Sequence, residues 1–200
     1  MFFSLEPRPE ATVLRLSGAE PTNTLTRARV IALTEQISEL ARAADPLPLI
    51  VTGNEHFFSA GADLKEINRL TGPEAYEFAA MGQRLMNAVD EFPAPTYAAV
   101  HGYCMGGGLD LALACRYRIA APNAVFGHRG AALGLITGWG GTQRLPRLIG
   151  KARALAMFVC AEKVLATRAV ELGLVDAIAD DAVGQCLRRC GDRACELRRP

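Results

Sequence analysis

Residues 100–121 read VHGYCMGGGLDLALACRYRIAA, and this stretch decides the fold. An apolar strand pattern over 96–100 leads into it, and three consecutive glycines follow at 106–108. A short helix is predicted directly after the glycines, and a second apolar strand over 117–121. A strand, a glycine turn, a helix and another apolar strand in such close succession are typical of an α/β unit whose strands lie in a parallel sheet.

The same alternation continues on both sides of this stretch. Further strands are predicted over 12–17, 47–52 and 175–178, and helices over 26–43, 71–92, 140–149, 151–160 and 167–172. Within the second of these helices, Thr71 and Glu74 have the spacing of a capping box, and Pro93 ends the helix. The sequence therefore predicts one α/β domain with helices packed over a largely parallel sheet.

Composition excludes several classes of protein. A chain of 200 residues that is 50% hydrophobic and 22% charged is expected to form one globular core. Its 22 basic and 21 acidic residues leave a formal net charge of +1, so we predict neither a nucleic-acid partner nor an anionic membrane surface as partner. The longest stretch without a formal charge, 92–109, contains two prolines and four glycines, so it is not predicted to span a membrane.

The first ten residues, MFFSLEPRPE, place Glu6 and Pro7 where a signal peptide would carry an apolar run. A cytoplasmic location is therefore expected, with the six cysteines as free thiols. The cysteines lack both the C-x-x-C spacing and the nearby histidine of a structural zinc site. No metal is predicted.

Three glycine-bearing segments, 58–63, 102–110 and 138–144, each lie between a predicted strand and a predicted helix. None completes a phosphate-binding loop or a dinucleotide-binding fingerprint, and Phe57 breaks the nucleophile-elbow pattern around Ser59. Glycines in such turns can bring backbone N–H groups close to a ligand oxygen, and two loops that face one oxygen form an oxyanion hole. The alternative is that all three are simply tight turns.

Four segments follow one another in a recognisable order: FFSAGADLKE at 57–66, the stretch 100–121, FGHRGAALGLITGWGGTQRLPRLIGKARA at 126–154 and AVELGLVDAI at 169–178. Together they resemble the enoyl-CoA hydratase/isomerase (crotonase) family. The resemblance runs from about Thr12 to about Asp180. It implies a crotonase-like α/β spiral of repeated β-β-α turns. It also implies an acyl-CoA substrate, with coenzyme A as part of that substrate and no other cofactor.

The resemblance assigns roles by position. It implies that the backbone N–H groups of Ala62 and Gly107 bind the thioester oxygen. Asp110 stands at the first of two glutamate positions of family hydratases and is predicted as the catalytic acid/base. The second position falls on Gly130, which has no carboxylate. The substrate-binding residues expected around these groups are Ala60, Gly61, Asp63, Leu64, Tyr103, Gly106, Gly130 and Trp139.

The missing second carboxylate leaves the reaction open. Hydration needs one group to activate water and another to handle the α-proton, so a single acid favours double-bond isomerisation or decarboxylation. His128 or Arg129 could replace the missing group, although a histidine beside a strand is more often a structural residue. A family member that binds acyl-CoA or a partner without turnover is a further alternative. If Gly130 faces the double bond, Gly130→Glu combined with Asp110→Glu is expected to raise hydration.

The expected core covers residues 1–180, and a short helical or frayed tail covers 181–200. In the family the chain continues beyond the LGLVD segment, here 172–176, into helices that cover the acyl site and pack on neighbouring subunits. That C-terminal helical segment is apparently shortened here, in a chain that is either naturally short or a fragment. We therefore expect a trimer-based homo-oligomer with weakened contacts and a more open acyl site.

Overall fold

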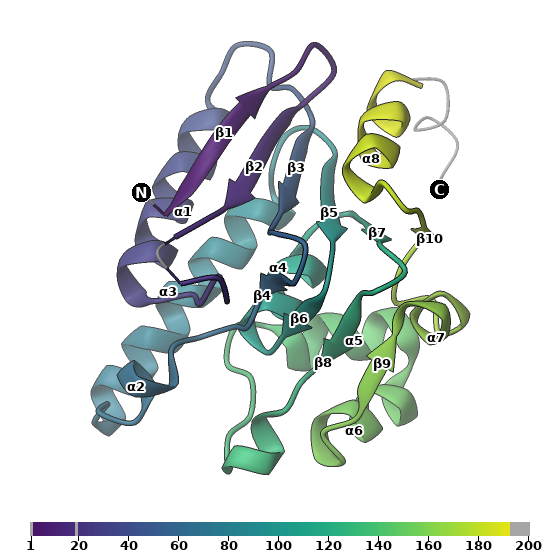
Figure 1. Cartoon of the computed structure of the whole chain (residues 1–200). Coiled ribbons are helices and arrows are strands. Elements are labelled where there is room, and N and C mark those ends of the chain that lie inside the picture. Colours follow the sequence, from purple (N-terminus) through teal and green to yellow (C-terminus); the bar gives the residue numbers. More distant parts are fainter. Residues whose placement is uncertain (1, 19, 193–200) are drawn as a thin grey trace.

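The structure is a computed structural model, which describes residues 2–18 and 20–192 and contains two sheets with helices around them (Figure 1). The larger sheet has the order β1-β2-β3-β5-β7-β10, with bounds Phe3–Pro7, Thr12–Leu16, Leu49–Thr52, Thr96–Val100, Tyr117–Ala120 and Ala177–Ile178. The smaller sheet has the order β4-β6-β8-β9, with bounds Phe57–Ser59, Tyr103–Met105, Val125–Gly127 and Lys163–Leu165. All strand pairs in these sheets are parallel except β1 with β2 and β8 with β9.

From β3 to β8, successive strands alternate between the two sheets, and a helix follows each pair. The pairs β3–β4, β5–β6 and β7–β8 each place one strand in the larger sheet and the next in the smaller one. The helices that follow are α2 (Leu64–Ile67) and α3 (Gly72–Asp90), then α4 (Gly107–Ala114), then the 3₁₀ helix η1 (Gly130–Leu133) and α5 (Gly141–Ile149). This arrangement is the spiral of repeated β-β-α turns that the sequence predicted, and the α/β fold class is confirmed.

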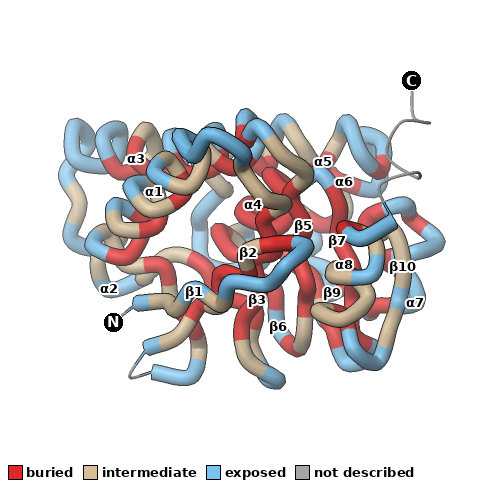
Figure 2. The backbone as a smooth tube through the Cα atoms, turned by 90° about the horizontal axis from the view of Figure 1, so that it is seen from above, coloured by how far each residue is buried: buried red, intermediate tan, exposed pale blue. Residues whose placement is uncertain are grey.

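Helices α1 (Arg27–Ala41) and α3 pack against each other over one face of the larger sheet. Both begin where the sequence provides a cap: the Thr26 hydroxyl accepts from the Arg29 N–H, and the Glu74 carboxylate accepts from the Thr71 N–H at 2.8 Å. Figure 2 shows that the strands in the middle of the molecule are buried and that the outer sides of these helices are exposed. No described helix has the length and apolar character needed to cross a bilayer.

Helix α8 (Ala182–Gly191) covers the other face of the larger sheet. Its buried Ala182, Cys186 and Cys190 join a cluster with Ile50 and Ile119 from the strands. The described part of the expected tail is therefore a helix that shares a core with the sheet, and residues 193–200 lie outside the described residues. Two further helices precede α8 in the chain: α6 (Lys151–Val159) and α7 (Ala166–Glu171).

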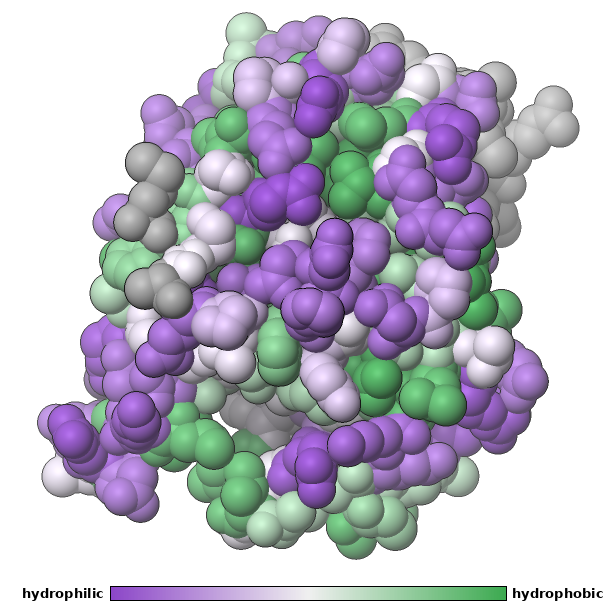
Figure 3. All heavy atoms as spheres, in the orientation of Figure 1, coloured by the Kyte–Doolittle hydropathy of each residue, from purple (hydrophilic) through white to green (hydrophobic). Residues whose placement is uncertain are grey.

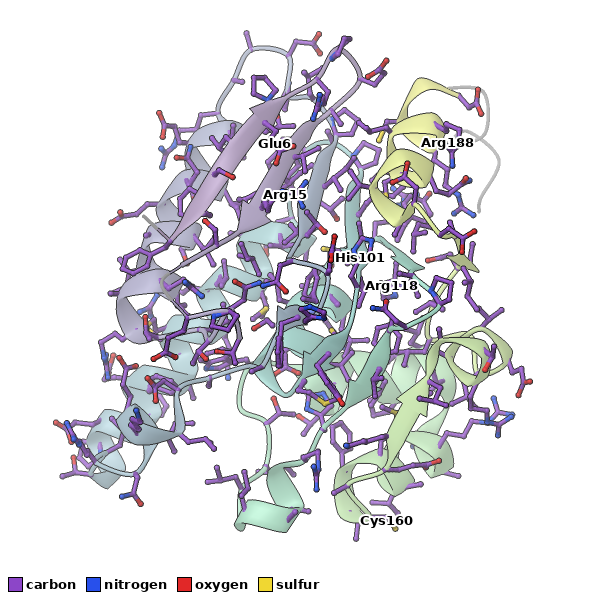
Figure 4. All side chains as sticks on the ribbon, viewed as in Figure 1. Glu6, Arg15, His101, Arg118, Cys160 and Arg188 are labelled. Carbon is purple, nitrogen blue, oxygen red and sulfur yellow. The ribbon has the colours of Figure 1, made fainter. Side chains whose placement is uncertain are left out.

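Five strands were missed by the sequence analysis. Four of them, β4, β6, β8 and β9, have three residues each, too short to show an alternating pattern. The fifth, β1, is an edge strand in which Glu6 accepts from the Arg15 Nε at 2.6 Å, and Figure 4 shows the two side chains on neighbouring strands. All cysteines of the described residues are free thiols, and Cys195 lies outside them.

Candidate active site

A cavity of about 290 Å³ opens between α2, α3, the start of α4 and the segment 128–139. Figure 3 shows hydrophobic side chains around a hollow at the lower edge of the molecule, between α2 and η1. The apolar walls include Leu64, Ile67, Leu70, Phe78, Leu135 and Ile136. Of the residues predicted from the sequence, the following line this cavity: Ala60, Ala62, Leu64, Gly106, Gly107, Asp110, Gly130 and Trp139.

Two glycine turns meet at one end of the cavity, and Gly61 shows why. Its backbone has φ +92°, which favours glycine, and a Cβ there would lie 2.6 Å from the Met105 carbonyl oxygen and 2.9 Å from the Gly107 nitrogen. The turn before α2 and the turn before α4 can therefore touch only because residue 61 has no side chain. Gly61 is buried behind this contact and does not line the cavity itself.

This contact brings the N–H groups of Ala62 and Gly107 close together. A Cβ on Gly107 would lie 3.3 Å from the Ala62 nitrogen. Since a Cβ lies about 2.5 Å from its own backbone nitrogen, the two amide nitrogens are within about 6 Å of each other. Gly107 is the first residue of α4, so its N–H has no acceptor within that helix. The described hydrogen bonds of the neighbouring turn use the N–H groups of Ala60 and Gly61, and not that of Ala62.

Asp110 lies in the first turn of α4, with only 1% of its surface exposed. The hydroxyl of Thr137 donates a short hydrogen bond to its Oδ2. Burial raises the pKa of the Asp110 carboxyl to about 7, while the Thr137 hydroxyl, Arg144 and the Gly141 N–H act against that rise. A carboxyl with such a pKa can both give and take a proton near neutral pH, as an acid/base group requires.

His128 is the nearest titratable neighbour of this carboxyl. Its Nε2 lies 3.3 Å from the Asp110 Oδ1, and its ring packs against Phe158 with 5.0 Å between centroids. Burial lowers the pKa of the imidazole to about 4. Between pH 4 and 7 the histidine is therefore neutral and the carboxyl protonated, so the two buried groups together hold about one proton.

The opposite pKa shifts of Asp110 and His128 predict opposite pH dependences of stability in two variants. Asp110→Asn leaves His128, whose pKa rises from about 4 to 6.5 on unfolding, so its free energy of unfolding should fall as the pH is lowered from 6.5 to 4. His128→Gln leaves Asp110, whose pKa drops from about 7 to 3.8 on unfolding, so its free energy of unfolding should fall as the pH is raised from 4 to 7.

Urea unfolding of both variants and the parent chain between pH 4 and 7 measures these changes in the free energy of unfolding, each expected to amount to about 3–4 kcal/mol relative to the parent. In the parent the two contributions largely cancel, because folded and unfolded pairs each hold about one proton in this range. Parallel curves for all three proteins would show that the burial of the pair does not shift the two pKa values.

Gly130 lines the cavity, but a side chain at this position would not point toward Asp110 as the sequence analysis expected. A Cβ on Gly130 would lie 2.6 Å from the Leu135 carbonyl oxygen, because the Leu135 N–H donates to the Gly130 carbonyl at 2.8 Å and closes the loop tightly. A side chain at 130 would therefore meet backbone before it reached open space. The expectation that Gly130→Glu would place a carboxylate opposite Asp110 is wrong for this loop conformation.

Besides Gly61, two predicted substrate-binding residues, Tyr103 and Asp63, do not line the cavity. Tyr103 is 41% exposed and packs against Phe57 and beneath the Lys163 ammonium, so it does not share the cavity with Trp139. Its neighbour Cys104 points inward instead, since side chains alternate along β6. Asp63 caps α2 by accepting from the Lys65 N–H at 2.7 Å, and it also lies outside the cavity lining.

Thr137 and Gly141 are site residues that the sequence analysis missed. A Cβ on Gly141 would lie 2.1 Å from the Asp110 Oδ1, so the start of α5 approaches the carboxyl closely. The segment 138–144 was singled out only for its glycines, and nothing in its local pattern pairs it with Asp110. Among the described residues there is no group of three His, Cys, Asp or Glu side chains arranged to hold a metal ion.

Comparison with known proteins places this geometry in a family. The model of the enoyl-CoA hydratase/isomerase family matches residues 10–195. A "Probable enoyl-CoA hydratase" of Bacillus subtilis is 42% identical over 162 residues, which cover 80% of this chain and 63% of the relative. A "Crotonyl-CoA hydratase" of Syntrophomonas wolfei is 35% identical over 175 residues, which cover 87% of this chain and 67% of the relative. The chain thus spans about two thirds of the length of these relatives.

Solved structures agree with the fold. The structure of DspI from Pseudomonas aeruginosa superposes with a TM-score of 0.91 at 36% identity, covering 96% of this chain and 80% of that one. An enoyl-CoA hydratase from Bacillus anthracis superposes with a TM-score of 0.91 at 32% identity, covering 97% of this chain and 77% of that one. On the match over residues 10–195 and these likenesses, the chain belongs to the enoyl-CoA hydratase/isomerase family.

Proposed function

We propose that this protein is an enzyme that acts on an acyl-CoA thioester through its enolate. The observation that carries the proposal is that two N–H groups with no acceptor among the described residues, on Ala62 and Gly107, meet the buried carboxyl of Asp110 in one apolar cavity. The thioester oxygen would accept hydrogen bonds from both N–H groups. These bonds stabilise the negative charge of the enolate most strongly in a site that excludes water. No cofactor beyond the coenzyme A of the substrate is proposed, and an oligomeric assembly and a cytoplasmic location stay predictions.

The reaction the site supports best is a proton transfer that moves the double bond of an enoyl-CoA. The C–H bond next to the thioester breaks, its electron pair moves toward the thioester oxygen, and the proton goes to Asp110. The enolate is held by the two N–H groups until Asp110 returns the proton to a different carbon. Each step needs one acid/base group, which matches a cavity where Asp110 is the only carboxylate among the described lining residues.

Hydration of a 2-enoyl-CoA is the second candidate. It is favoured by the relatives named as hydratases, which are 35% and 42% identical to this chain. It would require a second group to act on the water, and Gly130 provides no carboxylate. A side-by-side assay of the purified protein decides between the two: it should convert a 3-enoyl-CoA to the 2-enoyl isomer faster than it hydrates crotonyl-CoA. Faster hydration would reverse the order of the two candidates.

Vibrational spectroscopy tests the two N–H groups directly. Crotonyl-CoA with a ¹³C-labelled thioester carbonyl is expected to show a C=O stretch at lower frequency when bound, because two donors polarise the bond. Asp110→Asn is the matched control, since it keeps both N–H groups and should keep the shift. An unshifted carbonyl in a complex shown to be saturated would remove the oxyanion hole from the proposal.

A further inference from the structure

His128 is a buried titratable residue that has no role in the reaction proposed above. It follows β8 directly, lines the same cavity as Asp110 and has only 3% of its surface exposed. Its Nε2 and the Asp110 Oδ1 are each enclosed and each lack a hydrogen-bond partner within the described chain. The two atoms lie 3.3 Å apart, so each is the natural partner of the other once a proton stands between them.

The surroundings hold the two groups next to each other. Thr137 occupies the other oxygen of Asp110, and the Phe158 ring packs against the imidazole. A Cβ on Gly141 would lie 2.1 Å from the Asp110 Oδ1 and 2.9 Å from the His128 Nε2, so the site has room for the pair only because residue 141 is glycine. A histidine kept merely for packing would not need this clearance around its polar atom.

The other charged and titratable groups around the pair are few. Arg144 on α5 acts on the Asp110 carboxyl, and the buried Cys104 thiol on β6 feels the charge of Asp110. Arg129, next to His128 in the chain, lines the same cavity. None of these three brings a second carboxylate to the pair, so a proton that leaves Asp110 finds its nearest acceptor in His128.

We propose that His128 is the proton-holding partner of Asp110, through which this chain works without a second carboxylate. The inference rests on the proposed function and says how its acid/base group, Asp110, becomes a carboxylate.

Before the reaction the O–H bond at Asp110 Oδ1 breaks and an N–H bond forms at His128 Nε2, leaving a carboxylate beside an imidazolium. The carboxylate takes the proton from the substrate carbon and returns it to another carbon. The proton on Nε2 then goes back to Oδ1, so charge and protons balance. His128 is a positioning residue, since it acts through Asp110.

Nuclear magnetic resonance of the histidine rings tests the pairing without any substrate. The chain has three histidines, so each ring can be assigned in ¹⁵N-labelled protein. The Nε2 signal of His128 is expected to change with a midpoint near pH 7, where the neighbouring carboxyl titrates, and to lose that transition in Asp110→Asn. The exposed His56 is the internal control, and Asp110→Asn should leave its ring signals unchanged. A His128 signal that is flat from pH 6 to 8, or unchanged by Asp110→Asn, overturns the pairing.

Kinetics test the role. His128→Gln keeps a polar side chain that cannot hold a proton, and it is expected to lower the rate of α-proton exchange of an acyl-CoA with D₂O by about 10²-fold, with KM little changed and an altered pH profile. His56→Gln makes the same chemical change at an exposed histidine, so it should exchange nearly as fast as the parent.

The outcomes separate the two proposals. If His128→Gln loses thermal stability but exchanges at the parental rate and pH profile, His128 is structural and the inference is wrong. If the parent itself exchanges no α-proton although acyl-CoA binds, the proposed function fails, and the ring titration still shows whether Asp110 and His128 share a proton.

Discussion

Asp110→Asn should lower α-proton exchange of an acyl-CoA by about 10³-fold while the protein stays folded and still binds the ligand. The amide has nearly the same shape and can still accept from the Thr137 hydroxyl, but it cannot take up a proton. Exchange in D₂O followed by mass spectrometry measures the rate, and isothermal titration with crotonyl-CoA measures binding. Among the variants considered, this one has the largest expected effect on activity, because no other described residue lining the cavity has a carboxylate that could take the proton from the substrate carbon.

Asp63→Asn is the matched control for that experiment. It makes the same chemical change two positions from the meeting glycine turns, yet Asp63 lies outside the cavity and caps α2. It should change stability by only a few tenths of a kcal/mol, because asparagine caps a helix about as well as aspartate, and it should leave exchange unchanged. Exchange that survives Asp110→Asn, or falls equally in both variants, would show that Asp110 is not the acid/base group.

Trp139→Ala should have the largest effect on stability, a loss of about 3–5 kcal/mol in the free energy of unfolding. The indole is 3% exposed, and its Nε1 donates to the Phe78 carbonyl at 3.2 Å. Its ring fills the space above Gly82 and Gly107, where a Cβ would lie 2.1 Å and 2.5 Å from ring atoms. Truncation would thus leave a void beside the two N–H groups and remove the indole hydrogen bond, and acyl-CoA binding should weaken together with stability.

Tyr103→Ala is the comparison for Trp139→Ala, because the sequence assigned the two aromatic residues the same role. Tyr103 is 41% exposed on the outer side of β6, so its loss should cost about 1 kcal/mol or less and leave binding unchanged. Circular dichroism during urea unfolding is the measurement, since the chain has a single tryptophan and Trp139→Ala has no indole fluorescence. Similar losses in the two variants would contradict the packing described for Trp139.

Much of the fold was readable from local sequence. The helix that starts at Thr71 and the helix after Gly106 to Gly108 carry their own signals, a capping box and a glycine turn. The strands β3, β5 and β7 are buried throughout and mostly apolar, as strands covered on both faces are. These features depend on neighbours a few residues away, so no tertiary contact is needed to recognise them.

The strands of the smaller sheet escaped notice because three residues carry no period, and only pairing gives them their form. The same pairing determines to which side of the sheet the Tyr103 side chain points. Its register opposite Phe57 and Val125 turns the tyrosine outward and Cys104 inward, and a one-residue slip would have reversed both.

For the candidate site, the sequence by itself determined which residues could do chemistry: the glycine turns around Ala62 and Gly107, the acid at Asp110 and the absence of one at Gly130. Only the tertiary structure decided how they meet. It brought the start of α5 and the end of β8 to the same carboxyl, so that Thr137 and His128 became its partners. The physical reason is that burial, which shifts the pKa values of Asp110 and His128 in opposite directions, arises from packing between segments far apart in the chain.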